Sequence, residues 1–173
     1  MYKIRNKGFS LLEILLVLAI AAAVVIAAFI IYPKVTAEKT ADSESKRVMM
    51  IAAAARSLYA SKANYSGLTF DVLKNADLID KGMFAKMDGG MPISEFGTPM
   101  TLYAANGNTM VAVEYQQLKK ENCIRLVPKI GGGAHIIQIN GIPVLSPTVQ
   151  LNMGDVTTQC SAGIFNTVSF YFN

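Results

Sequence analysis

Few residues in this chain have side chains that could do chemistry, and Glu13 is the most informative of them. It is the only charged residue between Lys7 and Lys34, and almost every residue that follows it in this interval is apolar. A carboxylate inside a membrane segment costs on the order of 3 kcal/mol or more, so such an acid normally has a functional role and a partner. We therefore expect a specific partner for Glu13.

The other candidate chemical groups give little support for catalysis. His135 is the only histidine and lies at the edge of an apolar stretch, where a hydrogen-bonded strand histidine is commoner than a catalytic base. The run Gly131-Gly132-Gly133 lacks the Lys and Ser or Thr of a phosphate-binding loop, so we interpret it as a flexible loop. With one histidine and no clustered ligand spacing, we expect no metal, no cofactor and no enzymatic activity.

The segment that positions Glu13 is long enough to cross a membrane. Residues 14–32 are 19 residues without a formal charge, and a helix of that length covers roughly 28 Å. The hydrocarbon core of a bilayer is about 30 Å thick. Lys3, Arg5 and Lys7 precede the segment whereas Lys34 follows it, which indicates a cytoplasmic amino end and an exported carboxy part.

A secretory signal peptide is the alternative interpretation, because it also has a basic start and an apolar stretch. Residues 19–23 or 27–28 could supply its small-residue cleavage site, yet the apolar run continues to Tyr32 without a turn signal. The glycine that stands out, Gly8, precedes the apolar run.

The amino-terminal residues resemble a known processing signal. Residues 7–13, KGFSLLE, followed by ILLVLAI, resemble the class III signal of type IV pilins and pseudopilins. The resemblance implies that a membrane aspartyl peptidase cuts between Gly8 and Phe9 and then methylates the new amino terminus. It further implies that Glu13, the fifth residue of the mature chain, faces the Phe9 amine of a neighbouring subunit in a filament. Such a pair would set the axial register of the subunits; the alternative is that Glu13 only reaches toward the lipid headgroups.

Composition after removal of the leader bounds the remaining chain. Residues 9–173 contain 13 basic residues, because Lys3, Arg5 and Lys7 are lost from 16, against 12 acidic ones, for a formal net charge of +1. That charge gives no indication of nucleic-acid binding. Cys123 and Cys160 are the only cysteines, and an exported domain is oxidised, so we predict a disulfide between them. Two separately buried thiols are the alternative.

The chain beyond the membrane segment predicts an α+β head. We expect the first helix to run from Phe9 to Ser61 with a possible kink at Pro33, because its second half carries an apolar stripe at helical spacing: Val48, Ile51, Ala52, Ala55, Leu58 and Tyr59. A transmembrane half, an amphipathic half and a largely antiparallel sheet that covers the stripe together predict a lollipop shape. The expected divisions are a leader (1–8), a membrane or filament-core helix (9–32), its amphipathic continuation (33–62) and a globular head (63–173) with a disulfide-bounded region (123–160).

Within the head, turn and cap signals predict short elements. We expect a helix over 70–80 with Thr69 as its N-cap and Gly82 after its end, and another helix over 119–126. The strands are expected at 100–104, 109–115, 135–139, 142–145 and 167–172, with turns at 106–108 and 140–141 and loops at 88–90 and 96–99.

The carboxy-terminal half also resembles type IVb pilins, in residues 122–127, residues 139–141, Cys160 and residues 166–170. In that class the cysteine-bounded region lies on the pilus surface. The eight-residue leader and Phe9 are more similar to type IVa pilins or pseudopilins, so the subclass stays open.

These resemblances imply a helical polymer of identical subunits, used for adherence, aggregation or conjugation. The implied partners are a prepilin peptidase and methyltransferase, an inner-membrane assembly platform with its ATPase, membrane lipid before assembly, and host receptors or other pili. The chain would lie in the bacterial inner membrane with its head in the periplasm, and after assembly in an extracellular pilus. A pseudopilin or minor pilin of a secretion system, or a membrane-anchored binding domain that never polymerises, are the alternatives.

Overall fold

The computed structural model describes residues 10–79, 82, 87–88 and 91–173. The chain divides into a unit that ends at Ala37 and a unit from Glu38 to Asn173. Helix α1 (Leu11–Tyr59) runs through this division as one element of 49 residues. The predicted helix over 9–61 is therefore confirmed, with its end two residues earlier than expected, and Phe9 lies outside the described residues. The helix continues without interruption through position 33, where a kink was considered possible.

The second unit contains a five-stranded antiparallel sheet in the order β3-β4-β7-β5-β6. The predicted α+β class is confirmed. Its strands are β3 (Met100–Ala105), β4 (Met110–Lys119), β5 (Ile136–Ile139), β6 (Ile142–Leu145) and β7 (Phe165–Phe172). The last strand, β7, lies in the centre of the sheet between β4 and β5, so the carboxy terminus completes the sheet.

Both predicted hairpin turns are present, and their backbone explains their residues. Asn106, Gly107 and Asn108 have φ values of 51°, 67° and 67°, and Asn140 and Gly141 have 54° and 81°. Gly and Asn are the residues that tolerate this left-handed region best, which is why they mark tight turns. Strand β6 has the predicted bounds and β5 begins one residue later than predicted. Three strands are longer than predicted, and β4 continues to Lys119 past an irregularity after Tyr115.

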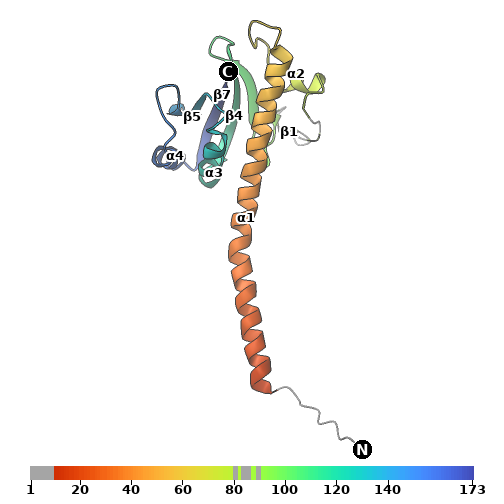
Figure 1. The fold of residues 1–173 in the computed structure, drawn as a ribbon, viewed down its shortest axis with the longest axis vertical. Helices are drawn as coiled ribbons and strands as arrows, with labels where there is room; N and C mark the ends of the chain where they lie inside the picture. The colour runs from red at the N-terminus through yellow and green to blue at the C-terminus, as the bar shows by residue number, and fades with distance from the viewer. Residues whose placement is uncertain (1–9, 80–81, 83–86, 89–90) are drawn as a thin grey trace, which may run out of the picture. The chain divides into compact units, whose positions relative to one another are not determined.

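One face of the sheet forms the core with α1 and α3 (Lys120–Ile130). The strand residues on this face are aligned across the sheet, because Leu102 pairs with Val113, Val113 with Phe170 and Phe170 with Ile137. The stripe predicted on α1 packs into the same core: Val48, Ile51, Ala52 and Ala55 are buried, and Leu58 and Tyr59 pack at its edge. Figure 1 shows this part of α1 running alongside β4.

Helix α2 (Phe70–Asn75) is shorter than the predicted helix over 70–80. Thr69 caps it as predicted, because its Oγ1 accepts a hydrogen bond from the Val72 amide at 3.3 Å. The chain then turns at Asp77, where φ is 52°. The amides of Asp77 and Leu78 donate to the carbonyls of Lys74 and Leu73, which is the Schellman arrangement that ends helices. The prediction was wrong here because aspartate takes the position where glycine is usual.

Three further differences concern the predicted helices and loops. Helix α3 continues to Ile130 through Pro128, four residues beyond the predicted end, because Val127 and Ile130 are buried in the core. Helix α4 (Met153–Cys160) was not predicted. Asp88, expected in a loop, ends the two-residue strand β1 (Met87–Asp88), which pairs with β2 (Met91–Pro92); residues 89–90 lie outside the description.

Candidate assembly interface

The amino-terminal part of α1 presents apolar side chains on all sides. It is long and apolar enough to cross a membrane, judged by length and composition. The large apolar residues whose side chains the structure describes here are exposed in the isolated chain: Leu11, Leu12, Ile14, Leu15, Leu16, Val17, Leu18, Ile20, Val24, Val25, Ile26, Phe29, Ile31, Tyr32 and Val35. A helix that is apolar all round is stable only when lipid or other helices surround it. This surface therefore needs a bilayer or neighbouring copies of the helix.

Glu13 lies in the first turn of this apolar helix. Its amide donates to the Ser10 carbonyl at 2.9 Å, and its carboxylate is exposed. An acid at this place stabilises the amino end of the helix through the helix dipole. Gly8 and Phe9, the predicted cleavage pair, lie outside the described residues.

A second acid of α1, Glu44, is fully buried in the head. Its Oε2 accepts a hydrogen bond from the Tyr115 hydroxyl at 2.6 Å. Its Oε1 accepts one from the Glu95 amide at 2.6 Å and one from the Arg47 guanidinium at 3.0 Å. A buried carboxylate is tolerated when hydrogen bonds and an opposite charge replace its water. Glu44 thus connects α1 to β4 and to the loop after β2.

Arg47 extends this network to the protein surface. Its second guanidinium nitrogen donates to the Glu95 carboxylate at 2.9 Å, and the Ser43 hydroxyl donates to the same oxygen at 2.8 Å. Burial raises the pKa of the Tyr115 hydroxyl well above its ordinary value, and the negative charge of Glu44 raises it further. Tyr115 therefore stays protonated and remains a donor to Glu44.

Ion pairs also join α1 to α3. Lys129 lies 2.6 Å from Asp42 and 3.2 Å from Glu38, and Arg125 lies 3.8 Å from Glu38. Hydrogen bonds to Asp42 and then Glu38 raise the pKa of Lys129. Exposed pairs of this kind contribute about 0–1 kcal/mol each, so they orient α3 more than they stabilise it.

The predicted disulfide is present and links α3 to α4. Cys123 and Cys160 are bonded, with their Cα atoms 5.8 Å apart, and both are buried. The Asn166 side chain, also buried, donates to the Cys160 carbonyl at 2.9 Å and accepts from the Asn140 amide at 2.8 Å. Asn166, at the start of β7, therefore links the end of α4 to the turn between β5 and β6.

The structure places the predicted site residues in separate units: Glu13 in the first, and the two cysteines in the second. His135 is half-buried beside β5 and its amide donates to the Tyr171 carbonyl at 2.8 Å, which fits the strand role. Sequence reasoning missed Glu44 and Tyr115. One signal was available, because Glu44 precedes Val48 and Ile51 by four and seven residues and so lies on the apolar stripe. Among the described residues, no three His, Cys, Asp or Glu side chains gather as metal ligands.

Two family models match this chain. The one described as "PilS N terminal" matches residues 38–173, and the one described as "Prokaryotic N-terminal methylation motif" matches residues 3–29. Together they cover the head and the amino-terminal segment.

Individual relatives share less than a third of their aligned residues with this chain. The "Major structural subunit of bundle-forming pilus" of Escherichia coli O127:H6 (strain E2348/69 / EPEC) is 28% identical over 128 residues, which are 73% of this chain and 66% of the relative; the protein of the same name from Escherichia coli O111:H- has the same values. The chain thus spans about 66% of the length of these relatives. The crystal structure of TcpA, a type IV pilin from Vibrio cholerae El Tor biotype, has a TM-score of 0.56 at 16% identity and covers 80% of this chain and 99% of that one. This likeness shows a shared fold.

Proposed function

The chain belongs to the family described as PilS N terminal, and from this premise we propose that it is a structural subunit of a type IV pilus. One observation carries the proposal: the exposed apolar segment of α1 lies largely within the match to an N-terminal methylation motif and contains a single acid, Glu13. The relatives named as major subunits of bundle-forming pili support the same function. The chain would have no enzymatic activity and would itself be the substrate of processing.

We propose the following route for the chain. A membrane peptidase cuts between Gly8 and Phe9 and methylates the Phe9 amine, and the head crosses to the periplasm while α1 stays in the inner membrane. An assembly platform with its ATPase then packs the α1 segments of successive subunits together. One contact repeated without closing produces a helical filament. The head domains form its outer surface, from which they can meet receptors or other pili.

Glu13 sets the register in this proposal. An ionised carboxylate surrounded by apolar helices requires an opposite charge close by. The first subunit residue, Phe9, provides a terminal amine four positions before Glu13, so an amine from a neighbouring subunit fixes the axial offset between the two helices.

Intact mass and amino-terminal sequencing of filaments sheared from producing cells test the proposal. We expect the bulk subunit to begin with methylated Phe9 and to lack the two hydrogens of the Cys123–Cys160 disulfide. A chain that is cut after Gly8 but forms no filaments would instead be a pseudopilin or minor pilin. An uncut leader in the membrane-bound chain would refute the proposal.

Variants at Glu13 test the register role separately. Glu13→Ala should be inserted and processed normally but form few or no filaments. The matched control combines Glu13→Ala with Ile14→Glu, which keeps the net charge but moves the acid by about 100° around the helix. Normal piliation of either variant would contradict a register role.

A further inference from the structure

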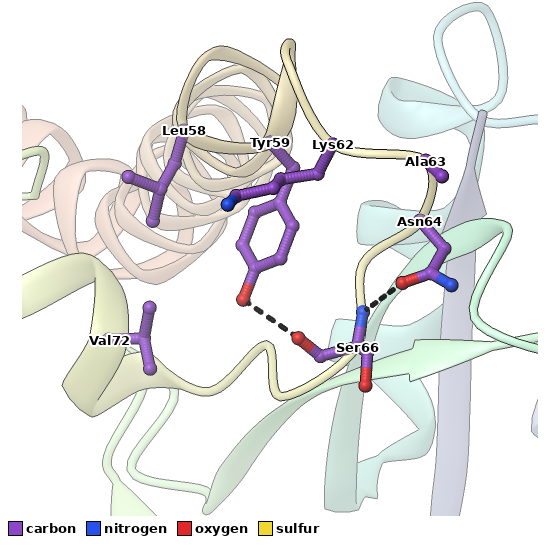
Figure 2. A pocket seen from close by; sticks show the side chains of 7 residues that line it. All are labelled: Leu58, Tyr59, Lys62, Ala63, Asn64, Ser66 and Val72. Carbon is purple, nitrogen blue, oxygen red and sulfur yellow. Dashed lines mark hydrogen bonds between the residues drawn. The ribbon is translucent and has the colours of Figure 1, made fainter.

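Two adjoining hollows lie beside the carboxy end of α1, within the second unit. The larger has a volume of about 480 Å³ and is drawn in Figure 2, with Leu58 and Val72 on one side and the loop after α1 on the other. The smaller has a volume of about 270 Å³. They share four lining residues: Tyr59, Lys62, Ala63 and Asn64. A ligand longer than one ring could therefore occupy both.

The smaller hollow is positively charged. Arg56 and Lys62 line it, and none of its described lining residues is acidic. Within the described parts of the chain, no carboxylate forms an ion pair with either cation. Arg56 has two other roles, because it lies in the last turn of α1 and 5.9 Å from the Phe172 ring centroid. Lys62 is exposed beyond the end of the helix, and its ammonium group makes no such contact with the described residues. These charges favour an anionic ligand.

Two tyrosines give the same hollow flat apolar surfaces. The Tyr59 and Tyr65 rings lie 5.6 Å apart at an interplanar angle of 48°, and both side chains are half-buried. A tyrosine ring combines an apolar face with a polar tip, which suits a ligand that has C–H faces as well as hydroxyl groups. A sugar ring has both.

The loop that lines both hollows is fixed by its own hydrogen bonds. The Tyr59 hydroxyl donates to the Ser66 carbonyl at 3.2 Å, and the Ser66 amide donates to Asn64 Oδ1 at 3.1 Å (Figure 2). The Tyr65 amide donates to the Asn108 carbonyl at 2.8 Å, which holds the loop against the β3–β4 turn. Asn64 uses its side-chain oxygen within the loop. Its side-chain nitrogen has no acceptor among the described residues, so it remains a donor for a ligand. A preformed loop reduces the entropy that binding costs.

We propose that the two hollows bind a short acidic oligosaccharide. A carboxylate-bearing sugar occupies the smaller hollow, where Lys62 and Arg56 meet the carboxylate and the tyrosine rings meet the sugar face. The next sugar lies in the larger hollow against Leu58 and Val72. The smaller volume lies just below the roughly 300–1,000 Å³ range of sites for drug-sized ligands, so it suits one ring rather than a whole oligosaccharide. An inorganic anion would leave the tyrosines unused, and a neutral sugar would leave the cations unused.

This site goes beyond pilus assembly and does not depend on it, because every residue that lines it belongs to one copy of the chain. The test therefore uses the unassembled full chain in detergent micelles. Saturation-transfer difference NMR measures binding of a disaccharide of glucuronic acid and N-acetylglucosamine, with lactose as the neutral disaccharide. We expect saturation of the acidic disaccharide to exceed that of lactose clearly. Equal binding of lactose would overturn the proposal, as would displacement of the disaccharide by an equal concentration of inorganic phosphate.

A charge reversal locates the site. Lys62→Glu should weaken the affinity for the acidic disaccharide by about tenfold or more, because it replaces a charged hydrogen-bond donor with a group that repels the carboxylate. Lys46→Glu is the matched control: Lys46 is also exposed, lies on α1 away from the hollows, and its reversal should change the affinity less than twofold. Unchanged circular dichroism would show that both variants fold. An affinity that Lys62→Glu leaves unchanged, or that both variants reduce equally, would refute the assigned site.

Discussion

Tyr115→Phe is the substitution that most directly tests how the head is held to α1. It removes one hydroxyl from a fully buried ring and leaves the rest of the core unchanged. That hydroxyl donates to Glu44 Oε2 at 2.6 Å. The ring itself packs against Phe170 with the centroids 6.1 Å apart, and phenylalanine preserves this contact. The variant therefore isolates a single hydrogen bond to a buried carboxylate.

The expected loss is about 2 kcal/mol in the free energy of unfolding, because hydrogen bonds to charged groups contribute about 1.5–3 kcal/mol. Glu44 keeps its bonds from the Glu95 amide and Arg47, so the buried charge is not left without partners. Glu44→Ala should cost more, about 3–5 kcal/mol, since it breaks a buried ion pair and leaves Tyr115 without its partner.

Urea unfolding of the full chain in detergent micelles, followed by near-ultraviolet circular dichroism, measures this loss. Tyr103→Phe is the matched control, because its hydroxyl donates to Glu114 at 3.2 Å in a half-buried position on the other face of the sheet. We expect the control to lose about 1 kcal/mol or less, because its bond is longer and water can replace it at the half-buried Glu114 carboxylate. If Tyr115→Phe lost no more than Tyr103→Phe, the buried network would not be what holds β4 to α1.

Three further predictions concern the head. Replacing both Cys123 and Cys160 by serine should lower the free energy of unfolding by about 4 kcal/mol, because the loop of 37 residues is no longer closed. Urea unfolding measures this loss, and a reductant should destabilise the wild type but not the double variant. Thr69→Ala should cost about 1 kcal/mol by removing the cap of α2, whereas Thr69→Ser should keep most of the stability in the same assay. Stability should also fall above the ordinary tyrosine pKa of 10.0, because burial raises the pKa of Tyr115 in the folded state and the unfolded chain loses that proton first. One tyrosine changes the free energy of unfolding by at most about 1.4 kcal/mol per pH unit. Between pH 10 and 11, Tyr115→Phe should therefore lose stability less steeply than the wild type. Equal slopes in the two proteins would show that Tyr115 does not cause the loss. The raised pKa of Lys129 acts in the same direction but is common to both proteins.

Patterns within one element were predictable from sequence. The stripe from Val48 to Tyr59 has helical spacing, and both turns that contain asparagine and glycine are marked by residues that accept positive φ values. The disulfide followed from the presence of only two cysteines in a domain that we expected to be exported. These signals are local or compositional, so they needed no knowledge of the sheet order.

Features that depend on tertiary contacts were not predictable in the same way. Helix α4 contains Gly154, Val156 and two threonines, which are weak helix formers; its Asn152 cap and its disulfide hold it in place. The central position of β7 depends on pairing with β4 and β5, more than 20 residues away in sequence. Glu44 was overlooked because its partners, Tyr115 and Glu95, are separated from it by 71 and 51 residues.

The two acids of α1, Glu44 and Glu13, have the same physical requirement: a carboxylate removed from water needs hydrogen-bond donors and an opposite charge. Glu44 is buried within the chain, and there a cation, a hydroxyl and an amide from the same chain supply all of its bonds. Glu13 has no side-chain partner among the described residues, and the apolar surface around it is exposed. If neighbouring helices bury that surface, the carboxylate of Glu13 needs an equivalent set of donors from another molecule. A terminal amine is a cation with several donors, so one neighbouring subunit could supply most of what Arg47, Tyr115 and Glu95 together supply to Glu44.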